Sequence, residues 1–177
     1  MKNRKLLLGT AIFGGAVAGV AILGGLFNPG RGATREWYSE LEKPSFNPPD
    51  AVFAPVWTTL YILIAASGYR IWSSDVGAER NRALTLWSTQ LTLNALWSPL
   101  FFGAKKPAVA LADIALMLAA IVSYTGAARK VDKPAAWLMS PYIAWVAFAT
   151  VLNAEIVRLN GVSGSALQTA RADTSSH

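Results

Sequence analysis

The chain of 177 residues contains no cysteine, and its one histidine is His177. The absence of cysteine excludes disulfides, thiolate metal sites and a cysteine nucleophile. A single terminal histidine also excludes a histidine-based metal site or catalytic triad. Charged residues make up only 15% of the chain and hydrophobic residues 53%, and the mean hydropathy is +0.35. A soluble domain of this length needs more polar surface, so the composition favours a membrane protein.

The formal net charge is +6, but the basic residues are scattered between apolar segments. They are not interleaved with aromatic residues, which argues against nucleic-acid binding. We interpret them as loop residues that set membrane orientation and meet anionic lipid headgroups. An N-terminus on the inner side would place nine basic residues there and seven on the other side, which favours that orientation by a narrow margin.

Five apolar segments predict a bundle of five transmembrane helices, because each is close to the ~20 residues that cross a bilayer. They span Leu6–Phe27, Ala51–Trp72, Ala83–Phe102, Ala108–Ala128 and Ala135–Val157. The first has an apolar run longer than that of a signal peptide, roughly 7–15 residues, so we expect it to be retained. Residues 1–160 are expected to form one all-α membrane domain. Residues 161–177, rich in Ser, Gly, Ala and Thr, are expected to be a disordered tail.

Prolines mark the connections between these segments. Pro107 and Pro134 lie where a helix would have its first residue, a position that tolerates the missing N–H. Pro55, Pro99 and Pro141 lie inside segments, where they are expected to kink helices and open space between them. The longest polar stretch, 28–50, contains Trp37 and Tyr38, which indicates a loop that folds back on the bundle.

Seven tryptophans are present, of which three lie well inside predicted helices. Those near helix ends are explained by anchoring at the membrane interface: Trp37, Trp72, Trp87 and Trp137. The interior three, Trp57, Trp97 and Trp145, are candidates for lining a cavity, because a buried indole N–H needs a partner.

Helical spacing places further residues on the same faces as these indoles. The three groups are Trp57 with Tyr61, then Trp87, Gln90, Asn94 and Trp97, and finally Tyr142, Trp145, Ala149 and Leu152. If the three faces converge, they form a pocket with flat apolar walls and a few polar groups, as ligand sites have. The alternative is an aromatic-rich packed core.

Two acidic residues fall within the apolar segments. Asp113 is expected to face the bundle interior and to hydrogen-bond across helices with Gln90, Asn94 or Asn153. Glu155 is three residues before Arg158 and is expected to pair with it near the interface.

Four ordered motifs resemble those of the translocator protein / tryptophan-rich sensory protein (TspO/MBR) family, in its bacterial form. They are WYSELEKPSFNPP at 37–49, APVWTTLY at 54–61, QLTLNALWSPLFFG at 90–103 and PYIAWVAFATVLN at 141–153. The resemblance covers most of residues 37–160.

The resemblance implies a homodimeric five-helix protein of a bacterial cell membrane, inner or outer, that binds porphyrins such as protoporphyrin IX or haem-type tetrapyrroles and requires no cofactor. The residues at positions that match the family motifs are expected to bind the ligand, together with the residues of the aromatic faces described above. The candidate ligand residues are Trp57, Tyr61, Asn94, Trp97, Tyr142, Trp145, Phe148, Ala149 and Leu152. The candidate lid residues are Trp37, Lys43, Pro44 and Phe46.

The resemblance leaves three functions open. The first is a porphyrin receptor or carrier with a regulatory or stress-sensing role in tetrapyrrole metabolism. The second is light-dependent porphyrin degradation at Trp57 and Trp145, and the third is transport of porphyrin-like or sterol-like ligands. Phe46 replaces a tryptophan of the family pattern, and Ala154 replaces the tyrosine of the animal sterol pattern, which weakens the sterol alternative.

Overall fold

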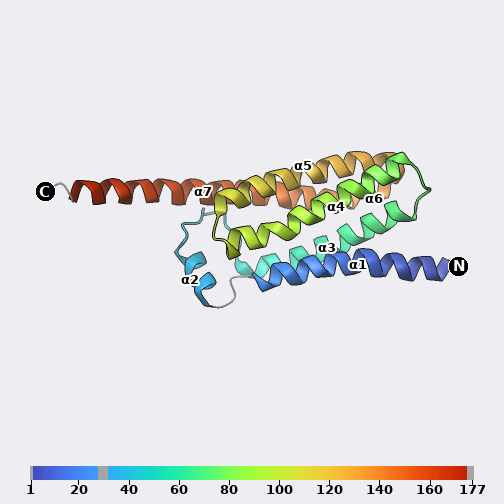
Figure 1. Cartoon of the computed structure of the whole chain (residues 1–177), viewed down its shortest axis with the longest axis horizontal. Coiled ribbons are helices and arrows are strands. Elements are labelled where there is room, and N and C mark those ends of the chain that lie inside the picture. Colours follow the sequence, from blue (N-terminus) through green and yellow to red (C-terminus); the bar gives the residue numbers. More distant parts are fainter. Residues whose placement is uncertain (1, 28–31, 175–177) are drawn as a thin grey trace.

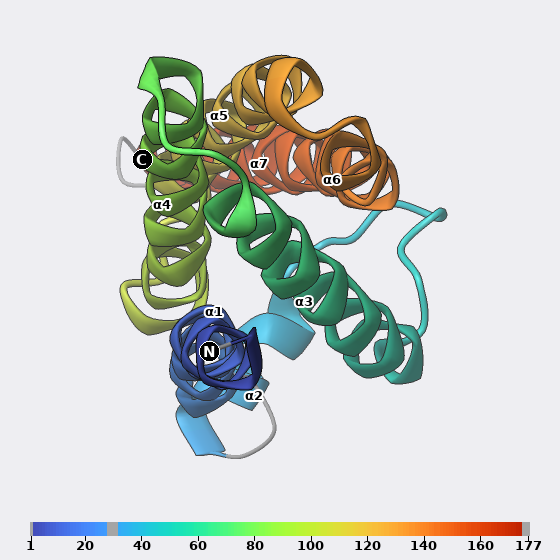
Figure 2. The same ribbon diagram turned by 90° about the vertical axis from the view of Figure 1, so that its right-hand side faces the viewer.

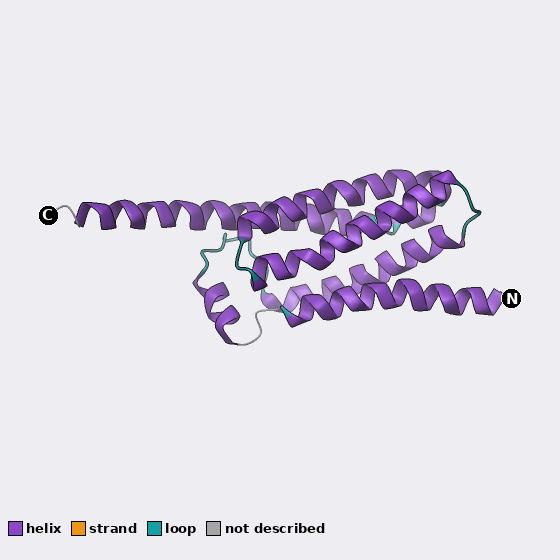
Figure 3. Cartoon of the chain, viewed as in Figure 1, coloured by secondary structure: helices purple, strands orange, loops and turns teal. Residues whose placement is uncertain are grey.

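The structure is a computed structural model that describes residues 2–27 and 32–174, and the side chains of 4–27 and 34–161. Figure 1 shows a bundle of long helices, and Figure 3 shows helices and loops without strands in the described part of the chain. The elements are α1 (Lys2–Leu26), α2 (Gly32–Glu40), α3 (Asp50–Ser73), α4 (Ala78–Ser98), a π-helical turn η1 (Pro99–Gly103), α5 (Pro107–Val131), α6 (Lys133–Trp137) and α7 (Ser140–Thr174).

The long helices run lengthwise (Figure 1). α4 packs against α5, α5 against α7 and α1 against α3 as antiparallel neighbours, and α1 also packs against α4, which runs in the same direction. The end-on view places α1 on one side of the bundle and α5, α6 and α7 on the other (Figure 2). α3 contacts α7 much less than it contacts α1, so α3 and α7 pack only loosely against each other.

Four described helices are long and apolar enough to cross a membrane, by length and composition. They span Arg4–Leu26, Asp50–Ser73, Pro107–Val131 and Lys133–Gly161. α4 is not among them, because it carries charges in its first turns and amides and hydroxyls along its length. The prediction of an all-helical protein with several apolar helices is thus confirmed, and the crossing of the membrane by α4 stays a prediction.

Several boundaries differ from the sequence-based expectation. Part of the polar stretch expected as a loop forms α2. The last predicted segment is broken, because α6 ends at Trp137 and α7 begins at Ser140. Pro141 therefore lies in the first turn of α7, where no N–H is needed, and the expected kink at this proline is wrong. Pro107 opens α5 as predicted, and Pro99 opens the π-helical turn.

The segment expected as a disordered tail differs as well. α7 continues through Thr174, so residues 161–174 are helical. Six of these fourteen residues, three alanines with leucine, glutamine and arginine, favour helix, whereas the other eight, which include Gly161 and Gly164, do not. Residues 175–177 of the predicted tail lie outside the described residues.

Trp87 lies in the packed centre of the bundle rather than at its surface. Its side chain is 5% exposed, and its indole Nε1 donates a 3.0 Å hydrogen bond to the carbonyl of Ile64. The interpretation of Trp87 as an interfacial anchor is therefore wrong. The close approach requires Gly68 on α3, since a Cβ there would lie 2.6 Å from ring atoms of Phe13 and Trp87.

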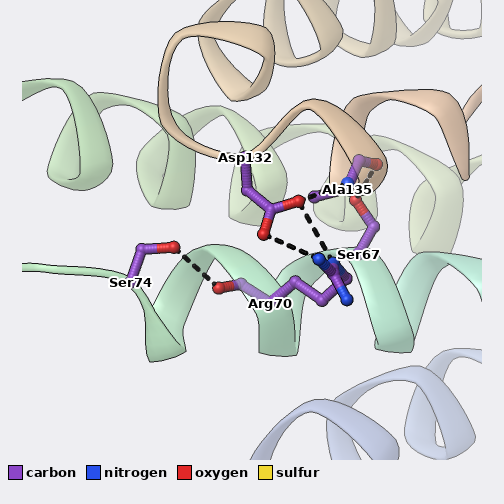
Figure 4. Close-up of polar contacts among 5 residues, drawn as sticks. All are labelled: Ser67, Arg70, Ser74, Asp132 and Ala135. Atoms are coloured by element: carbon purple, nitrogen blue, oxygen red, sulfur yellow. Dashed lines mark hydrogen bonds and ion pairs between the residues drawn. The ribbon is translucent and has the colours of Figure 1, made fainter.

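Polar contacts join α3 to the connection between α5 and α6 (Figure 4). The guanidinium of Arg70 donates to both carboxylate oxygens of Asp132, at 3.1 and 3.0 Å. Asp132 also caps α6 by accepting a 2.7 Å hydrogen bond from the amide of Ala135. Nearby, the buried hydroxyl of Ser67 donates to the carbonyl of Ala135 at 2.8 Å. These contacts fix the end of the bundle opposite to α2.

Candidate functional site

Four of the predicted ligand residues form one connected group across α3, α4 and α7. The hydroxyl of Tyr61 donates to Asn94 Oδ1 at 3.1 Å, and Asn94 Nδ2 donates to the hydroxyl of Tyr142 at 2.8 Å. The Trp57 ring lies 5.3 Å from the Tyr61 ring and 6.3 Å from the Tyr142 ring. The spacing argument correctly brought these faces together. Tyr142 is fully buried and Asn94 is 7% exposed, so their polar atoms face one another rather than an open cavity.

Trp97 belongs to a second group. Its indole Nε1 donates to Asn153 Oδ1 at 3.2 Å, and Asn153 Nδ2 donates to the carbonyl of Pro107 at 3.0 Å. The Trp97 ring stacks on Phe101 with centroids 5.0 Å apart, and Leu152 packs in the same cluster. Trp97 is therefore bonded to α7, and its partner Asn153 is bonded in turn to α5, whereas Asn94 bonds to Tyr61 and Tyr142.

A groove of about 690 Å³ lies between α3 and α7, which pack loosely against each other. Its lining is almost wholly apolar and consists of Pro48, Pro55, Val56, Thr59, Leu60, Pro141, Ala144, Trp145 and Phe148. The one hydroxyl, on Thr59, donates to the carbonyl of Pro55 at 3.0 Å and so is satisfied within its own helix. The volume lies within the range of about 300–1,000 Å³ that is usual for small-molecule sites.

Only two of the predicted ligand residues line this groove, Trp145 and Phe148. Their rings are 5.6 Å apart, and Phe53 of α3 lies 5.7 Å from the Trp145 ring. Ala149 packs at the edge of the main core and does not line the groove.

Sequence reasoning missed Phe53, Pro48, Thr59 and the pair Pro141 and Ala144. The spacing of Pro141, Ala144, Trp145 and Phe148 along one face of α7 is the signal that would have found the last two.

The loop after α2 reaches the groove at one point. The ring of Phe46 lies 6.3 Å from Phe148, at a steep angle of 67°, and Pro48 is part of the lining. Phe46 is 46% exposed, so part of its ring remains open to a ligand or to lipid. Of the four predicted lid residues, Phe46 is the one in direct contact with a residue of the groove.

The other predicted lid residues shape the loop. The ammonium of Lys43 donates to the carbonyls of Tyr38 and Leu41 and lies 4.4 Å above the Tyr38 ring, so it closes the C-terminal end of α2. The carbonyl of Pro44 accepts a 2.9 Å hydrogen bond from the amide of Asn47.

Two further residues tie the loop to the rest of the chain. The ring of Trp37 in α2 packs against the ring of Phe101 in η1, with the ring centroids 5.9 Å apart. The side chain of Asn160 on α7 donates to the carbonyl of Glu42 at 3.0 Å and accepts from its amide at 3.1 Å.

Burial changes the ionisation of Tyr38 in this loop region. Burial and, to a smaller degree, the negative charge of Asp50 raise the pKa of Tyr38, against the opposing effect of a hydrogen bond with Asn47. Its hydroxyl is neutral at physiological pH.

The predicted interhelical polar contacts are partly present. Asn94 and Asn153 bond across helices, whereas Gln90 Nε2 donates to the carbonyl of Trp87 in its own helix. Within the described chain, Gln90 Oε1 and one carboxylate oxygen of Asp113 have no hydrogen-bond partner. Glu155 pairs with Arg158 as predicted. No group of three acidic or histidine side chains able to hold a metal occurs in the ranges that the structure describes.

Comparison with known proteins shows the family to which the chain belongs. Residues 12–159 match the model of the TspO/MBR family. The chain is 38% identical over 161 residues to the tryptophan-rich protein TspO of Chlorobaculum tepidum, which covers 88% of this chain and 98% of that protein. It is 39% identical over 125 residues to the tryptophan-rich sensory protein of Cereibacter sphaeroides, covering 71% of this chain and 77% of the relative. It is 42% identical over 120 residues to the human translocator protein, covering 66% of this chain and 70% of the relative. The chain therefore belongs to the TspO/MBR family.

Proposed function

We propose that this protein is a membrane receptor or carrier that binds a porphyrin in the groove between α3 and α7. The observation that carries the proposal is the lining of the groove. Trp145 and Phe148 on α7 are opposed by apolar side chains of α3, in a space of about 690 Å³. A flat, largely apolar macrocycle suits such a space, because its faces bury apolar area against rings and its rim needs few polar partners.

The loop after α2 supports the same proposal. Phe46 stands beside Phe148 at the mouth of the groove, and Asn160 attaches the preceding backbone of Glu42 to α7. In this arrangement the loop covers one side of a bound ligand. The group around Asn94 has a supporting role, since it fixes α3, α4 and α7 relative to one another behind the groove.

The test is a titration of the purified protein with protoporphyrin IX, followed by tryptophan quenching and by the visible absorbance of the porphyrin. Trp145→Phe is expected to weaken binding roughly 2- to 10-fold, because an indole that stacks on the ligand is replaced by a smaller ring. Trp137→Phe is the matched control, since Trp137 is 72% exposed and lies outside the groove. Equal affinity of the two variants would refute the groove as the porphyrin site.

We further propose that α4 is the fifth transmembrane helix. Its hydroxyls are satisfied within the helix, which lowers the cost of placing them in lipid. Thr85, Ser88, Thr89 and Thr92 each donate to the carbonyl four residues earlier, at 3.0–3.1 Å. α4 also lies between spans that are apolar enough to cross, and it packs along α5.

The absence of cysteine in the native chain makes this testable with single-cysteine variants. Val76→Cys reports on the connection between α3 and α4, and Lys106→Cys reports on the connection between α4 and α5. If α4 crosses the bilayer, a membrane-impermeant maleimide added to sealed vesicles labels only one of the two. Labelling of both from the same side would exclude the fifth crossing.

A further inference from the structure

The two ends of the bundle carry very different charge. One end comprises the start of α1, the connection between α3 and α4, and the connection between α5 and α6, which lie together in Figure 1. We refer to it as the basic end. Its basic residues are Lys2, Arg4, Lys5, Arg70, Arg80, Arg82, Arg129, Lys130 and Lys133, and its acidic residues are Asp75, Glu79 and Asp132.

Nine basic residues against three acidic ones give the basic end a net charge of +6. Apart from Asp113 in the centre of α5, the remainder of the described chain has six basic and six acidic residues, so its charges balance. Its basic residues are Arg35, Lys43, Lys105, Lys106, Arg158 and Arg171, and its acidic residues are Glu36, Glu40, Glu42, Asp50, Glu155 and Asp173. Counting only the basic residues of the whole chain, nine against seven, does not reveal this difference in net charge, because most acidic residues lie away from the basic end.

The acidic residues of the basic end neutralise only part of its charge. Asp132 pairs with Arg70, and Glu79 pairs with Lys130 at 3.3 Å. Two other cations are used within the fold, since Arg80 donates to the carbonyl of Trp72 at 2.8 and 3.2 Å and Lys5 lies 5.5 Å above the Trp72 ring.

Four cations of the basic end remain directed outward. Arg4, Arg82, Arg129 and Lys133 are exposed, and none has an ion pair with another described residue. They come from α1, α4, α5 and α6, so the unpaired charge is spread across the whole end of the bundle rather than along one helix.

An exposed indole accompanies this charge. Trp137 ends α6, four residues after Lys133, and is 72% exposed. Tryptophan at the end of an apolar bundle is typical of the headgroup level of a bilayer, where the ring contacts both lipid and water. Cations that point outward beside an indole at this level would be within reach of lipid phosphates.

We propose that the basic end is a binding surface for anionic phospholipid headgroups and lies in the anionic leaflet of the membrane. The opposite end, with almost balanced charge and with the loop next to the groove, then faces the less charged side. The surface potential of an anionic leaflet attracts juxtamembrane cations and falls off within a Debye length, so the attraction depends on ionic strength.

The experiment measures lipid selectivity with the full chain in phosphatidylcholine vesicles. Spin-labelled phosphatidylglycerol or spin-labelled phosphatidylcholine is added, and electron spin resonance gives the fraction of each lipid that the protein immobilises. The wild-type protein is expected to prefer phosphatidylglycerol by up to about 5-fold per accessible cation, and the preference is expected to shrink as sodium chloride is raised.

The test variant combines Arg129→Gln with Lys133→Gln, and the matched control combines Arg35→Gln with Lys106→Gln at the other end. All four side chains are exposed, and each variant removes two positive charges. The test variant is expected to lose most of the preference, and the control is expected to keep it. Circular dichroism of both variants shows that the helices are retained.

Two outcomes would overturn the proposal. The first is equal selectivity of the test and control variants, or no preference in the wild-type protein, because the charge asymmetry would then have no effect on lipid contact. The second is that sodium phosphate abolishes the preference for phosphatidylglycerol, whereas sodium chloride of the same ionic strength does not. That result would indicate a discrete phosphate site instead of a surface for a leaflet.

Discussion

Asn94 on α4 and Tyr142 on α7 are joined by a 2.8 Å hydrogen bond from the amide Nδ2 to the phenol oxygen, in the buried centre of the bundle. The same amide accepts from Tyr61 on α3, so one side chain links three helices. We expect Asn94→Leu to lower the free energy of unfolding by about 1–3 kcal/mol, because buried polar groups lose their partners. Thermal unfolding in detergent measures this.

Tyr61→Phe is the control for that variant. It removes only the bond from Tyr61 to Asn94 Oδ1 and leaves the bond between Asn94 and Tyr142 in place. Its expected cost is smaller, about 0.5–1.5 kcal/mol. If Asn94→Leu is as stable as the wild-type protein, Asn94 does not hold the three helices together.

Gly68 gives a prediction about helix packing. A methyl group at this position would lie 2.6 Å from ring atoms of Phe13 and Trp87, so Gly68→Ala is expected to push α1 and α4 away from α3 and to cost about 1–3 kcal/mol. Gly126→Ala is the matched control, because no atom lies within 4 Å of its added Cβ and alanine favours helix. The midpoint of unfolding should fall for the first variant only. A fall of similar size in both would point to helix geometry rather than to the rings.

The sequence was most informative about which residues share a face of one helix, because helical periodicity determines this. Spacing placed Trp57 with Tyr61 on one helix face, and Asn94 and Tyr142 on faces of two other helices, and left open whether the faces converge. In the structure they meet. Helical spacing also places Trp87 on the face of Asn94, whereas its position near a helix end suggested an interfacial anchor. Spacing within one helix could not reveal Gly68, the residue of another helix that admits the Trp87 ring into the core. The same limit applies to Trp97, whose partner Asn153 lies 56 positions away in the sequence.

The location of the groove was less predictable. It lies between α3 and α7 because these two helices pack loosely, and loose packing depends on how all the helices cross. Motif matching selected the residues around Asn94, which instead fill the space behind the groove. The short helix α6 was also beyond pattern analysis, since it begins at a cap by Asp132 and ends at Trp137, before α7 begins at Ser140, inside one continuous apolar segment.

The attachment of the loop after α2 can be tested at Asn160. Its amide group makes two hydrogen bonds to the backbone of Glu42, one as donor and one as acceptor. Asn160→Ala removes both, and we expect faster hydrogen exchange in residues 41–47 with the remaining helices unchanged. Asn160→Asp is the comparison that keeps the acceptor and loses the donor, and it should give an intermediate rate. Unchanged exchange in the alanine variant would show that other contacts hold the loop.

The contact between Arg70 and Asp132 predicts how stability depends on pH. Burial raises the pKa of Asp132, but the hydrogen bonds from Arg70 and from the amide of Ala135, together with the charge of Arg70, outweigh burial and lower it. A carboxyl with a lowered pKa in the folded state stabilises the fold above its unfolded-state pKa of about 4. That contribution is lost as the pH falls below about 4 through the folded-state value, because protonation removes the ion pair.

Asp132→Asn is therefore expected to unfold at a lower temperature than the wild-type protein at pH 7, with the difference shrinking as the pH approaches 3. Thermal unfolding across this range measures the convergence. Asp75→Asn is the control, because Asp75 is exposed at the same end of the bundle and has no ion pair with a described residue. A difference between wild type and Asp132→Asn that stays constant from pH 7 to pH 3 would mean that the carboxylate charge does not stabilise this end. The cap of α6 would not account for such a loss, because the amide oxygen of asparagine can accept the same hydrogen bond from Ala135.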